Sequence, residues 1–153
     1  MFLLQKEPID SNLAKNTYIN HHNGALVSFE GLVRSDKHEN KEVFSLLYIA
    51  DEPVCLKEGE SIMKEAISSF HLTSALCIQR IGEVQAGQTA IWIGAWSPHR
   101  DEAFKGCRFI IEETKKRLLI WKKENFTNGT SAWVRGPQTP VIYANSDPRQ
   151  EGI

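Results

Sequence analysis

The sequence predicts an α+β fold that combines antiparallel sheets with two main helices. Segments with strand character follow one another in adjacent pairs separated by single helical segments, an order that favours antiparallel pairing over a doubly wound parallel sheet. Neither an internal repeat nor a linker-like stretch divides the 153 residues, a length that suits one compact domain. We therefore expect a single domain over residues 1–153, with a loosely ordered polar tail from about residue 144.

The first pair of strands follows the turn-forming "NHHNG". In "GALVSFEGLVR" (24–34), one face of the strand carries Val27, Phe29, Gly31 and Val33. The stretch "EVFSLLYIA" (42–50) is rich in aromatic and branched residues, which strands favour. Between them, "SDKHENK" is predicted to be a polar loop of the kind that often carries function.

The first helix and the second pair of strands come next. Residues 57–70 place apolar side chains at three-and-four spacing, which predicts an amphipathic helix. "SALCIQRI" (74–81) and "TAIWIGAW" (89–96) return to strand character, and Gly82 and Gly87 punctuate their connection as in a hairpin.

The second predicted helix covers "SPHRDEAFKGCRFIIEETKKRLL" (97–119). Ser97 suits the N-cap and Pro98 the first helical position. His99 and Arg100 then lie in the first turn, where free N–H groups and the helix dipole favour a bound anion, and arginine adds donors that match phosphate. A purely structural role for the pair is the alternative that the local sequence leaves open.

The later part of this helix concentrates positive charge in "KKRLLIWKKE" (115–124). An apolar stripe is expected to face the core, formed by Phe104, Cys107, Ile111, Thr114, Leu118 and Trp121. On a continuous helix, Arg108, Lys115 and Lys122 lie within about 40° of one another beside this stripe. Partial desolvation there lowers the pKa of a lysine and makes it an acid–base group; the alternative is ordinary border lysines with solvated ammonium groups. A short strand at 131–135 and the proline-rich "GPQTPVIY" follow.

Composition argues against several classes of protein. A non-catalytic module that binds anions or nucleic acid is an alternative explanation for the row of Arg108, Lys115 and Lys122. Against it, the formal net charge is −1 and the isoelectric point is near 6.5, whereas nucleic-acid-binding proteins generally show a strongly positive face. No stretch approaches the roughly 20 apolar residues of a membrane span, and the start lacks the basic region of a signal peptide, so we expect a cytoplasmic protein. The cysteines stand singly and the histidines are scattered, so we expect no metal site and no cofactor.

Several motifs occur together in one order along the chain. They are "GALVSFEGLVR", the Y-x-x-x-E-P order of "YIADEP", "RIGEVQAGQTAIWI", "HRDEAF", and "IWKKE" followed by G-x-x-x-W-V. From about Gly24 to Val134 the chain therefore resembles the large, catalytic subunit of molybdopterin synthase.

The resemblance implies a sulfurtransferase of molybdenum cofactor biosynthesis. In that family a small ubiquitin-like subunit carries sulfur as a thiocarboxylate on its C-terminal glycine and inserts this tail into the large subunit. Cyclic pyranopterin monophosphate receives two sulfurs there and becomes the dithiolene of molybdopterin. The implied assembly is a homodimer of large subunits within a heterotetramer, and the implied fold is an α/β hammerhead with additional antiparallel sheet.

The resemblance also assigns roles to residues. It makes Lys115 and Lys122 the catalytic groups. The residues implied to bind substrate are Arg34, Phe29, His99, Arg100, Lys123 and Arg135, of which His99 and Arg100 serve the other copy's site across the dimer interface.

Three features depart from the family pattern, one of which is that "YIADEP" lacks the second tyrosine common in the family. Leu119 stands where a proline is common, so the helix either runs on or ends near this point, and Lys122 then lies either on the helix or on a following strand. Gln79 replaces a histidine. A homologue that binds anions or a partner without catalysis remains the alternative function.

Overall fold

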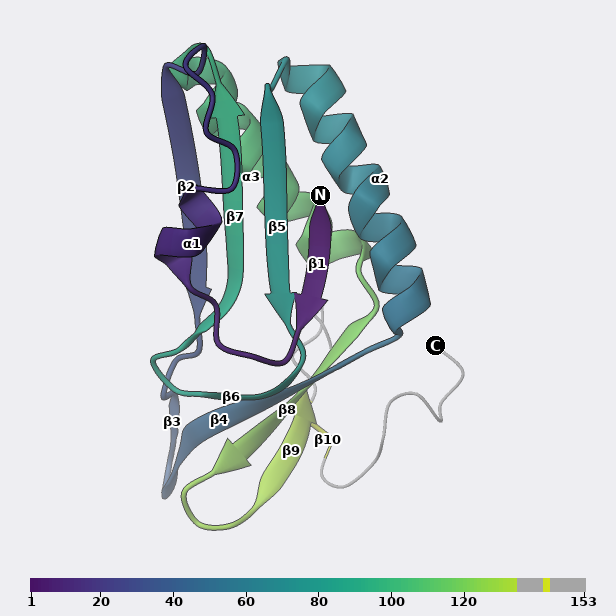
Figure 1. Cartoon of the computed structure of the whole chain (residues 1–153). Coiled ribbons are helices and arrows are strands. Elements are labelled where there is room, and N and C mark those ends of the chain that lie inside the picture. The colour runs from purple at the N-terminus through teal and green to yellow at the C-terminus, as the bar shows by residue number, and fades with distance from the viewer. Residues whose placement is uncertain (135–141, 144–153) are drawn as a thin grey trace.

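Two β-sheets and three helices make up the computed structural model, which describes residues 1–134 and 142–143. The first sheet and the two long helices occupy one end of the molecule, and the second sheet occupies the other (Figure 1). The predicted α+β class, with antiparallel sheets and two main helices, is confirmed.

The first sheet has four strands. Their order is β1 (Phe2–Gln5), β5 (Ser74–Arg80), β7 (Thr89–Ser97) and β2 (Ala25–Leu32). The three longer strands are confirmed predictions, β2 from its alternation and β5 and β7 from their strand character, and they pair antiparallel. The sequence analysis missed β1, which pairs parallel to β5 and is too short to show a period. Strand β2 thus forms one edge of this sheet.

The second sheet is antiparallel and is built around β4. Its order is β10 (Ile142–Tyr143), β9 (Ser131–Val134), β8 (Ile120–Phe126), β4 (Lys41–Ala50) and β3 (Lys37–His38), with β6 (Gly82–Gln85) also paired to β4. Strand β3 forms within the predicted loop between the first two strands. Strand β6 forms within the predicted hairpin connection, and it joins the second sheet to the strands of the first.

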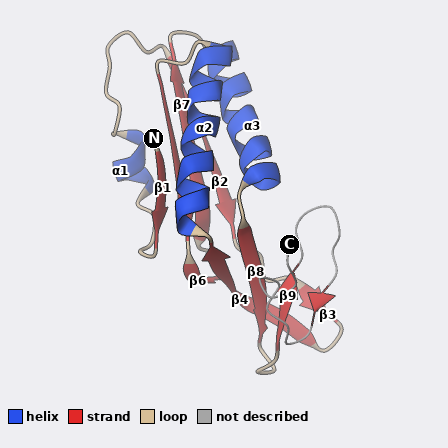
Figure 2. Ribbon diagram, turned by 90° about the vertical axis from the view of Figure 1, so that its right-hand side faces the viewer, coloured by secondary structure: helices blue, strands red, loops and turns tan. Residues whose placement is uncertain are grey.

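Helices cover both faces of the first sheet. Helices α2 (Glu52–Phe70) and α3 (Arg100–Arg117) lie side by side on one face, and the short α1 (Ser11–Lys15) lies on the other (Figure 2). The main core lies under α2 and α3 and includes Ile62, Met63, Ile93 and Ile110. Since Ile110 is fully buried, its truncation to alanine is expected to cost about 2–5 kcal/mol.

Helix α2 begins five residues before the predicted start at Lys57. The Asp51 side chain accepts a hydrogen bond from the Val54 N–H, and Pro53 occupies the first turn. An acidic N-cap followed by a proline is itself a start signal, which the apolar spacing alone does not reveal.

Helix α3 begins at Arg100, so the prediction of Ser97 as N-cap and Pro98 as the first helical residue is wrong. Ser97 is the last residue of β7, fully buried and opposite Ala25 of β2. Pro98 disfavours helical backbone at the residue before it, which suits the end of a strand. His99 is the N-cap, without a side-chain bond, and Arg100 remains in the first turn as predicted.

Helix α3 ends at Arg117, and this overturns the continuous helix that would carry Lys122 and Trp121. The backbone turns extended at Leu118, with φ −78° and ψ 132°, and β8 begins two residues later. Pairing of β8 with both β4 and β9 outweighs the helical spacing. Phe104 was also placed wrongly, because it is 62% exposed, while the buried face of α3 comprises Ala103, Gly106, Cys107, Ile110 and Thr114.

The remaining expectations concern the ends and the surface. The polar tail from residue 144 and Arg135 lie outside the described residues. No helix in the described part of the chain has the length and apolarity of a membrane span.

Candidate active site

A cavity of about 280 Å³ opens where the end of α3 meets both sheets. Its charged walls come from separate segments, namely the residues just after β2, the last turn of α3, and β8. They are Arg34, Asp36, Lys115, Lys122 and Glu124. Three cations against two carboxylates give this wall a formal charge of +1. An anion entering the cavity therefore meets a positive surplus.

Lys122 reaches the cavity because β8 is a strand. It lies opposite Tyr48 of β4, which also lines the cavity, and alternation puts Glu124 on the same face. Lys123 consequently lies on the other face, where its Nζ is 5.5 Å from the centroid of the Trp133 ring. Of the two adjacent lysines in "IWKKE", only Lys122 lines the cavity.

The pKa values of both cavity lysines are lowered. Burial is the main cause at Lys115, and the positive charge of Lys122 adds to it. Burial also dominates at Lys122, with Arg34 adding and Glu124 opposing. Lys115 keeps solvent-exposed surface, so solvent screens part of the effect on its pKa. Both amines are therefore easier to deprotonate than an ordinary lysine, as proton exchange near neutral pH requires.

The carboxylates of the cavity have partners of their own. Arg34 Nη2 lies 3.4 Å from Asp36 Oδ2, on largely exposed side chains. Glu124 Oε2 is buried and lies 3.6 Å from His38 Nε2, and neither atom has a hydrogen-bond partner among the described residues. The sequence analysis missed Glu124, because a position two residues after Lys122 shares its face only on a strand.

Two neutral residues complete the walls. Burial raises the pKa of Tyr48 to about 12, so its phenol stays protonated at physiological pH. Gln79 is 5% exposed, and its Nε2 donates to the carbonyls of Arg80 (2.9 Å) and Ala90 (3.2 Å). Tyr48 was quoted in a motif and Gln79 was named as a departure from the family pattern. Neither was predicted as a site residue, because nothing local shows that their side chains face a cavity.

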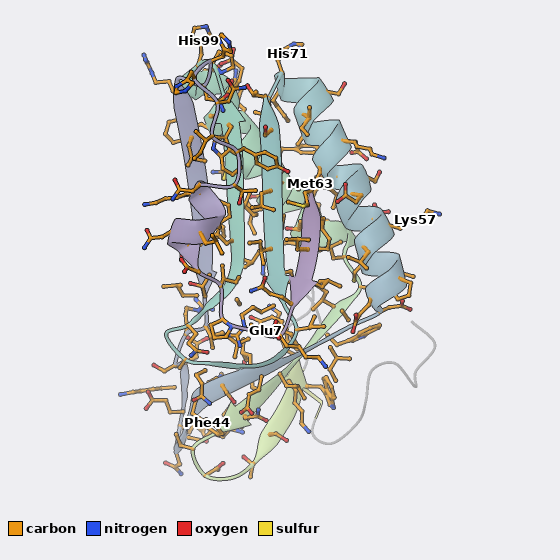
Figure 3. All side chains as sticks on the ribbon, in the orientation of Figure 1. Glu7, Phe44, Lys57, Met63, His71 and His99 are labelled. Atoms are coloured by element: carbon orange, nitrogen blue, oxygen red, sulfur yellow. The ribbon has the colours of Figure 1, made fainter. Side chains whose placement is uncertain are left out.

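His99 and Arg100 lie at the opposite end of α3. They line a separate hollow of about 460 Å³ with Gly24 and Pro98. Fifteen residues of helix separate Arg100 from Lys115, a rise of roughly 22 Å. Figure 3 shows His99 at the end of the molecule far from Phe44 of β4. Within one chain, therefore, this pair does not meet the cavity lysines.

Phe29 lies between these two regions on the edge strand β2. It is 39% exposed and lines a groove of about 550 Å³ with Phe104 and Arg108 of α3. It also packs close to Gly31, which lines the lysine cavity, since a Cβ at Gly31 would lie 3.4 Å from the Phe29 ring. Phe29 is thus adjacent to the cavity without lining it.

A metal site has no support in the described residues, where no three His, Cys, Asp or Glu side chains gather around a common point. Cys55, Cys77 and Cys107 are all free and buried. Burial raises the pKa of the Cys107 thiol to about 11, which makes it a poor nucleophile.

Comparison with known families decides the assignment. The family model described as "MoaE protein" matches residues 4–117, about three quarters of the chain. The chain belongs to the MoaE family. The resemblance read from the sequence motifs is thereby confirmed, and the MoaE match spans every element from β2 to α3.

Curated MoaE relatives carry one name. A molybdopterin synthase catalytic subunit from Pyrococcus abyssi is 36% identical over 135 residues, covering 87% of this chain and 90% of the relative. One from Nostoc sp. is 39% identical over 113 residues, covering 73% and 68%.

Solved MoaE-like structures have the same fold. Molybdopterin synthase from Staphylococcus aureus superposes with a TM-score of 0.80 at 32% identity, covering 88% of this chain and 96% of that one. A complex of subunits 1 and 2 of the molybdopterin-converting factor from Helicobacter pylori aligns with a TM-score of 0.66 at 18% identity, covering 96% and 91%. This second likeness concerns the fold alone.

Proposed function

We propose that this chain is the catalytic subunit of a molybdopterin synthase. It transfers sulfur from the C-terminal thiocarboxylate of a small ubiquitin-like subunit to cyclic pyranopterin monophosphate, forming the dithiolene of molybdopterin. One observation carries the proposal: in a MoaE-family chain, Lys115 and Lys122 from a helix and a strand line the same positively charged cavity. The cytoplasmic location expected from the sequence belongs to this proposal, and three free cysteines suit it.

The cations suit the charges of the reaction. The thiocarboxylate of the partner's tail is an anion, and the second substrate carries a phosphate. The thiocarboxylate sulfur first displaces an oxygen substituent from a side-chain carbon of the pterin. Water then adds to the thioacyl carbon, and negative charge develops on its oxygen. The bond from that carbon to sulfur breaks next, which leaves the sulfur on the pterin and a carboxylate on the tail. Lys115 at the end of α3 and the guanidinium of Arg34 stabilise that oxygen, because fixed cations in a partly buried cavity interact more strongly than in water.

Proton transfer is the second task of the site. New carbon–sulfur bonds require protons to move on the pterin side chain. A lysine with a lowered pKa releases and recovers a proton more readily near neutral pH. The backbone of Lys122 is held in an antiparallel pair with β4, so its side chain enters the cavity from the same wall as Tyr48 and Glu124. We assign acid–base chemistry to Lys115 and Lys122 together, since both line one cavity and the charge of Lys122 lowers the pKa of Lys115.

The small subunit is the proposed partner of the lysine cavity. A molybdopterin-converting factor was solved as a complex of its two subunits, and its chain has the same fold as this one. An extended C-terminal tail fits a cavity that lies between two sheets and a helix end. Because sulfur arrives already bonded to that tail, the large subunit needs no catalytic cysteine of its own, in keeping with its buried thiols.

His99 and Arg100 are proposed to complete the site of a second copy. Strand β2 is a sheet edge with exposed Leu26, Phe29 and Leu32, and an exposed apolar edge favours association. The start of β2 lies beside Ser97, next to His99, and its end lies at the lysine cavity.

Two copies meeting along this edge about a two-fold axis run antiparallel. His99 and Arg100 of one copy then lie beside Arg34 of the other, since β2 spans roughly 26 Å at 3.3 Å per residue, close to the rise of α3 between its ends. A homodimer within a heterotetramer follows. In this arrangement Phe29 lies at the junction of the two copies. Lys123 faces away from the cavity, so its expected contact with the substrate is not part of this proposal.

The decisive experiment is Lys115→Ala, assayed with thiocarboxylated small subunit and cyclic pyranopterin monophosphate. We expect product formation to fall at least about 100-fold, the scale of losing a positioned acid–base group, with dimer mass and circular dichroism unchanged. The matched control is Lys64→Ala, an exposed lysine on α2 that should retain wild-type turnover. Near-normal turnover in Lys115→Ala would favour the alternative, a MoaE homologue that binds anions or a partner without catalysis.

A further inference from the structure

Arg117, in the last turn of α3, is bound to α2 by an unusually complete set of hydrogen bonds. Its Nη1 and Nη2 donate to the two carboxylate oxygens of Glu65 at 2.8 and 2.9 Å, a bidentate arrangement, and its Nε donates to Glu58 Oε1 at 2.5 Å. One turn earlier on α3, Glu113 Oε2 lies 3.5 Å from Arg117 Nη1. Both hydrogen-bonded carboxylates belong to α2, so this side chain joins the end of one helix to the other.

The segment after Arg117 is held by α2 as well. The Leu119 carbonyl accepts a hydrogen bond from the Asp51 N–H at 3.3 Å and from the Cys55 Sγ–H at 3.2 Å. Asp51 is the N-cap of α2, and Cys55 is fully buried in its first turn. Leu118 and Leu119, the two residues that separate α3 from β8, therefore lie between two attachments to α2, one at Arg117 and one at the Leu119 carbonyl.

Helix α2 is itself a rigid support. Ile62, Met63 and Ala66 are buried in the main core. Gly59 lies against the Phe2 ring so closely that a Cβ there would come within 2.2 Å of it. Packing of this density resists displacement. Whatever α2 holds is therefore fixed relative to the first sheet.

The two cavity lysines lie on either side of this attached segment. Lys115 precedes Arg117 by two residues, and Lys122 follows Leu119 by three. Arg117 itself does not line the cavity. We propose that Arg117 is a positioning residue, which through Glu58 and Glu65 of α2 fixes the separation of Lys115 from Lys122 for sulfur transfer. This inference rests on the proposed function.

A role in stability alone does not explain the arrangement. The four side chains are between 22 and 44% exposed, so the ion pairs contribute modestly to folding. A change in the direction of β8 is more serious, because a displacement of about 1 Å in a catalytic group costs on the order of 100-fold in rate. Lysine at this position would supply a point charge without the bidentate geometry.

The test compares Arg117→Met, Arg117→Lys and the control Lys116→Met. Lys116 is the adjacent cation and pairs with Glu113 at 3.6 Å on its own helix, without touching α2. We expect kcat to fall about 10- to 100-fold in Arg117→Met with KM changed less than about threefold, and to fall less in Arg117→Lys. Lys116→Met should keep wild-type kcat.

A second readout follows the lysines directly and needs no turnover. The Lys115 amine, titrated by NMR, faces Lys122 on β8 and Cys77 on β5, and the charge of Lys122 lowers its pKa. Arg117→Met removes the bonds from Arg117 to Glu58 and Glu65, so Lys122 is free to move away from Lys115. The pKa of Lys115 should then rise in Arg117→Met but not in Lys116→Met. An unchanged pKa together with a kcat loss that only tracks the unfolded fraction would overturn the inference. Failure of the proposed function is separate, because it is signalled by an active Lys115→Ala enzyme.

Discussion

Lysines with lowered pKa values at the cavity oppose folding while they serve chemistry. A folded-state pKa below that of the unfolded chain means that the unfolded chain holds the proton more tightly, so stability rises with pH between the two values. Below both values the charged amine costs the folded state the full unfavourable free energy. Lys115 has this sign, with burial first and Lys122 second as causes.

Lys115→Met is therefore expected to be more stable than the wild type at pH 7, although inactive. The methionine keeps most of the aliphatic side chain and removes the charge. The difference in urea midpoint should shrink as pH rises towards about 10.4, where an unfolded lysine loses its proton. Lys64→Met on exposed α2 surface should show no such pH dependence of stability. A Lys115→Met variant less stable than the wild type at pH 7 would contradict this direction of the pKa shift.

Local sequence patterns predicted the elements whose character is visible within a short window of residues. The alternation in β2 and the apolar, branched composition of β5 and β7 are visible in the sequence, and these strands are confirmed. Residues 118–126 were harder, because three-and-four spacing happens to continue past Arg117. Pairing with β4, some 70 residues earlier, decides that Ile120–Phe126 is a strand, and no local window contains that partner. The same error hid Glu124 from the predicted site.

The junction of α3 and β8 allows a direct test of this element boundary. Leu118 already has the extended backbone that precedes proline, and among the described residues the Leu119 N–H has no backbone partner. Leu119→Pro is expected to keep or raise stability, by up to about 1 kcal/mol, because it restricts the unfolded chain. The Leu118 N–H instead donates to the Thr114 carbonyl at 3.2 Å.

Leu118→Pro serves as the matched control, since it removes that bond and should lower the urea midpoint. If α3 continued through residues 118–121, both prolines would interrupt it and both would destabilise by about 3 kcal/mol or more. Equal losses of stability in the two variants would therefore indicate that α3 continues past Leu119 and carries Lys122. Urea denaturation followed by circular dichroism measures both.

At the scale of the whole molecule, the proposed site is incomplete in one chain. The lysine cavity and the hollow at His99 and Arg100 lie at opposite ends of α3 and β2. The spacing of these residues along a helix predicts how far apart they lie in one chain. It does not predict that a second copy brings them together. Among the described residues, β2 forms a sheet edge with exposed apolar side chains, and this edge suggests where a second copy binds. The edge follows from the strand order of the folded chain, which local sequence does not reveal.

Mixed dimers decide whether the site is shared. One chain carries His99→Ala and Arg100→Ala, and the other carries Lys115→Ala. If the pocket is shared, one site of this dimer keeps both intact sets and the other lacks both, so about half of wild-type activity remains. The reciprocal dimer joins a wild-type chain to a chain with all three changes. There each site lacks one set, and activity at low substrate concentration should fall well below half. A pocket built within one chain reverses the two results, because the triple-mutant dimer then retains one intact site and the first dimer retains none.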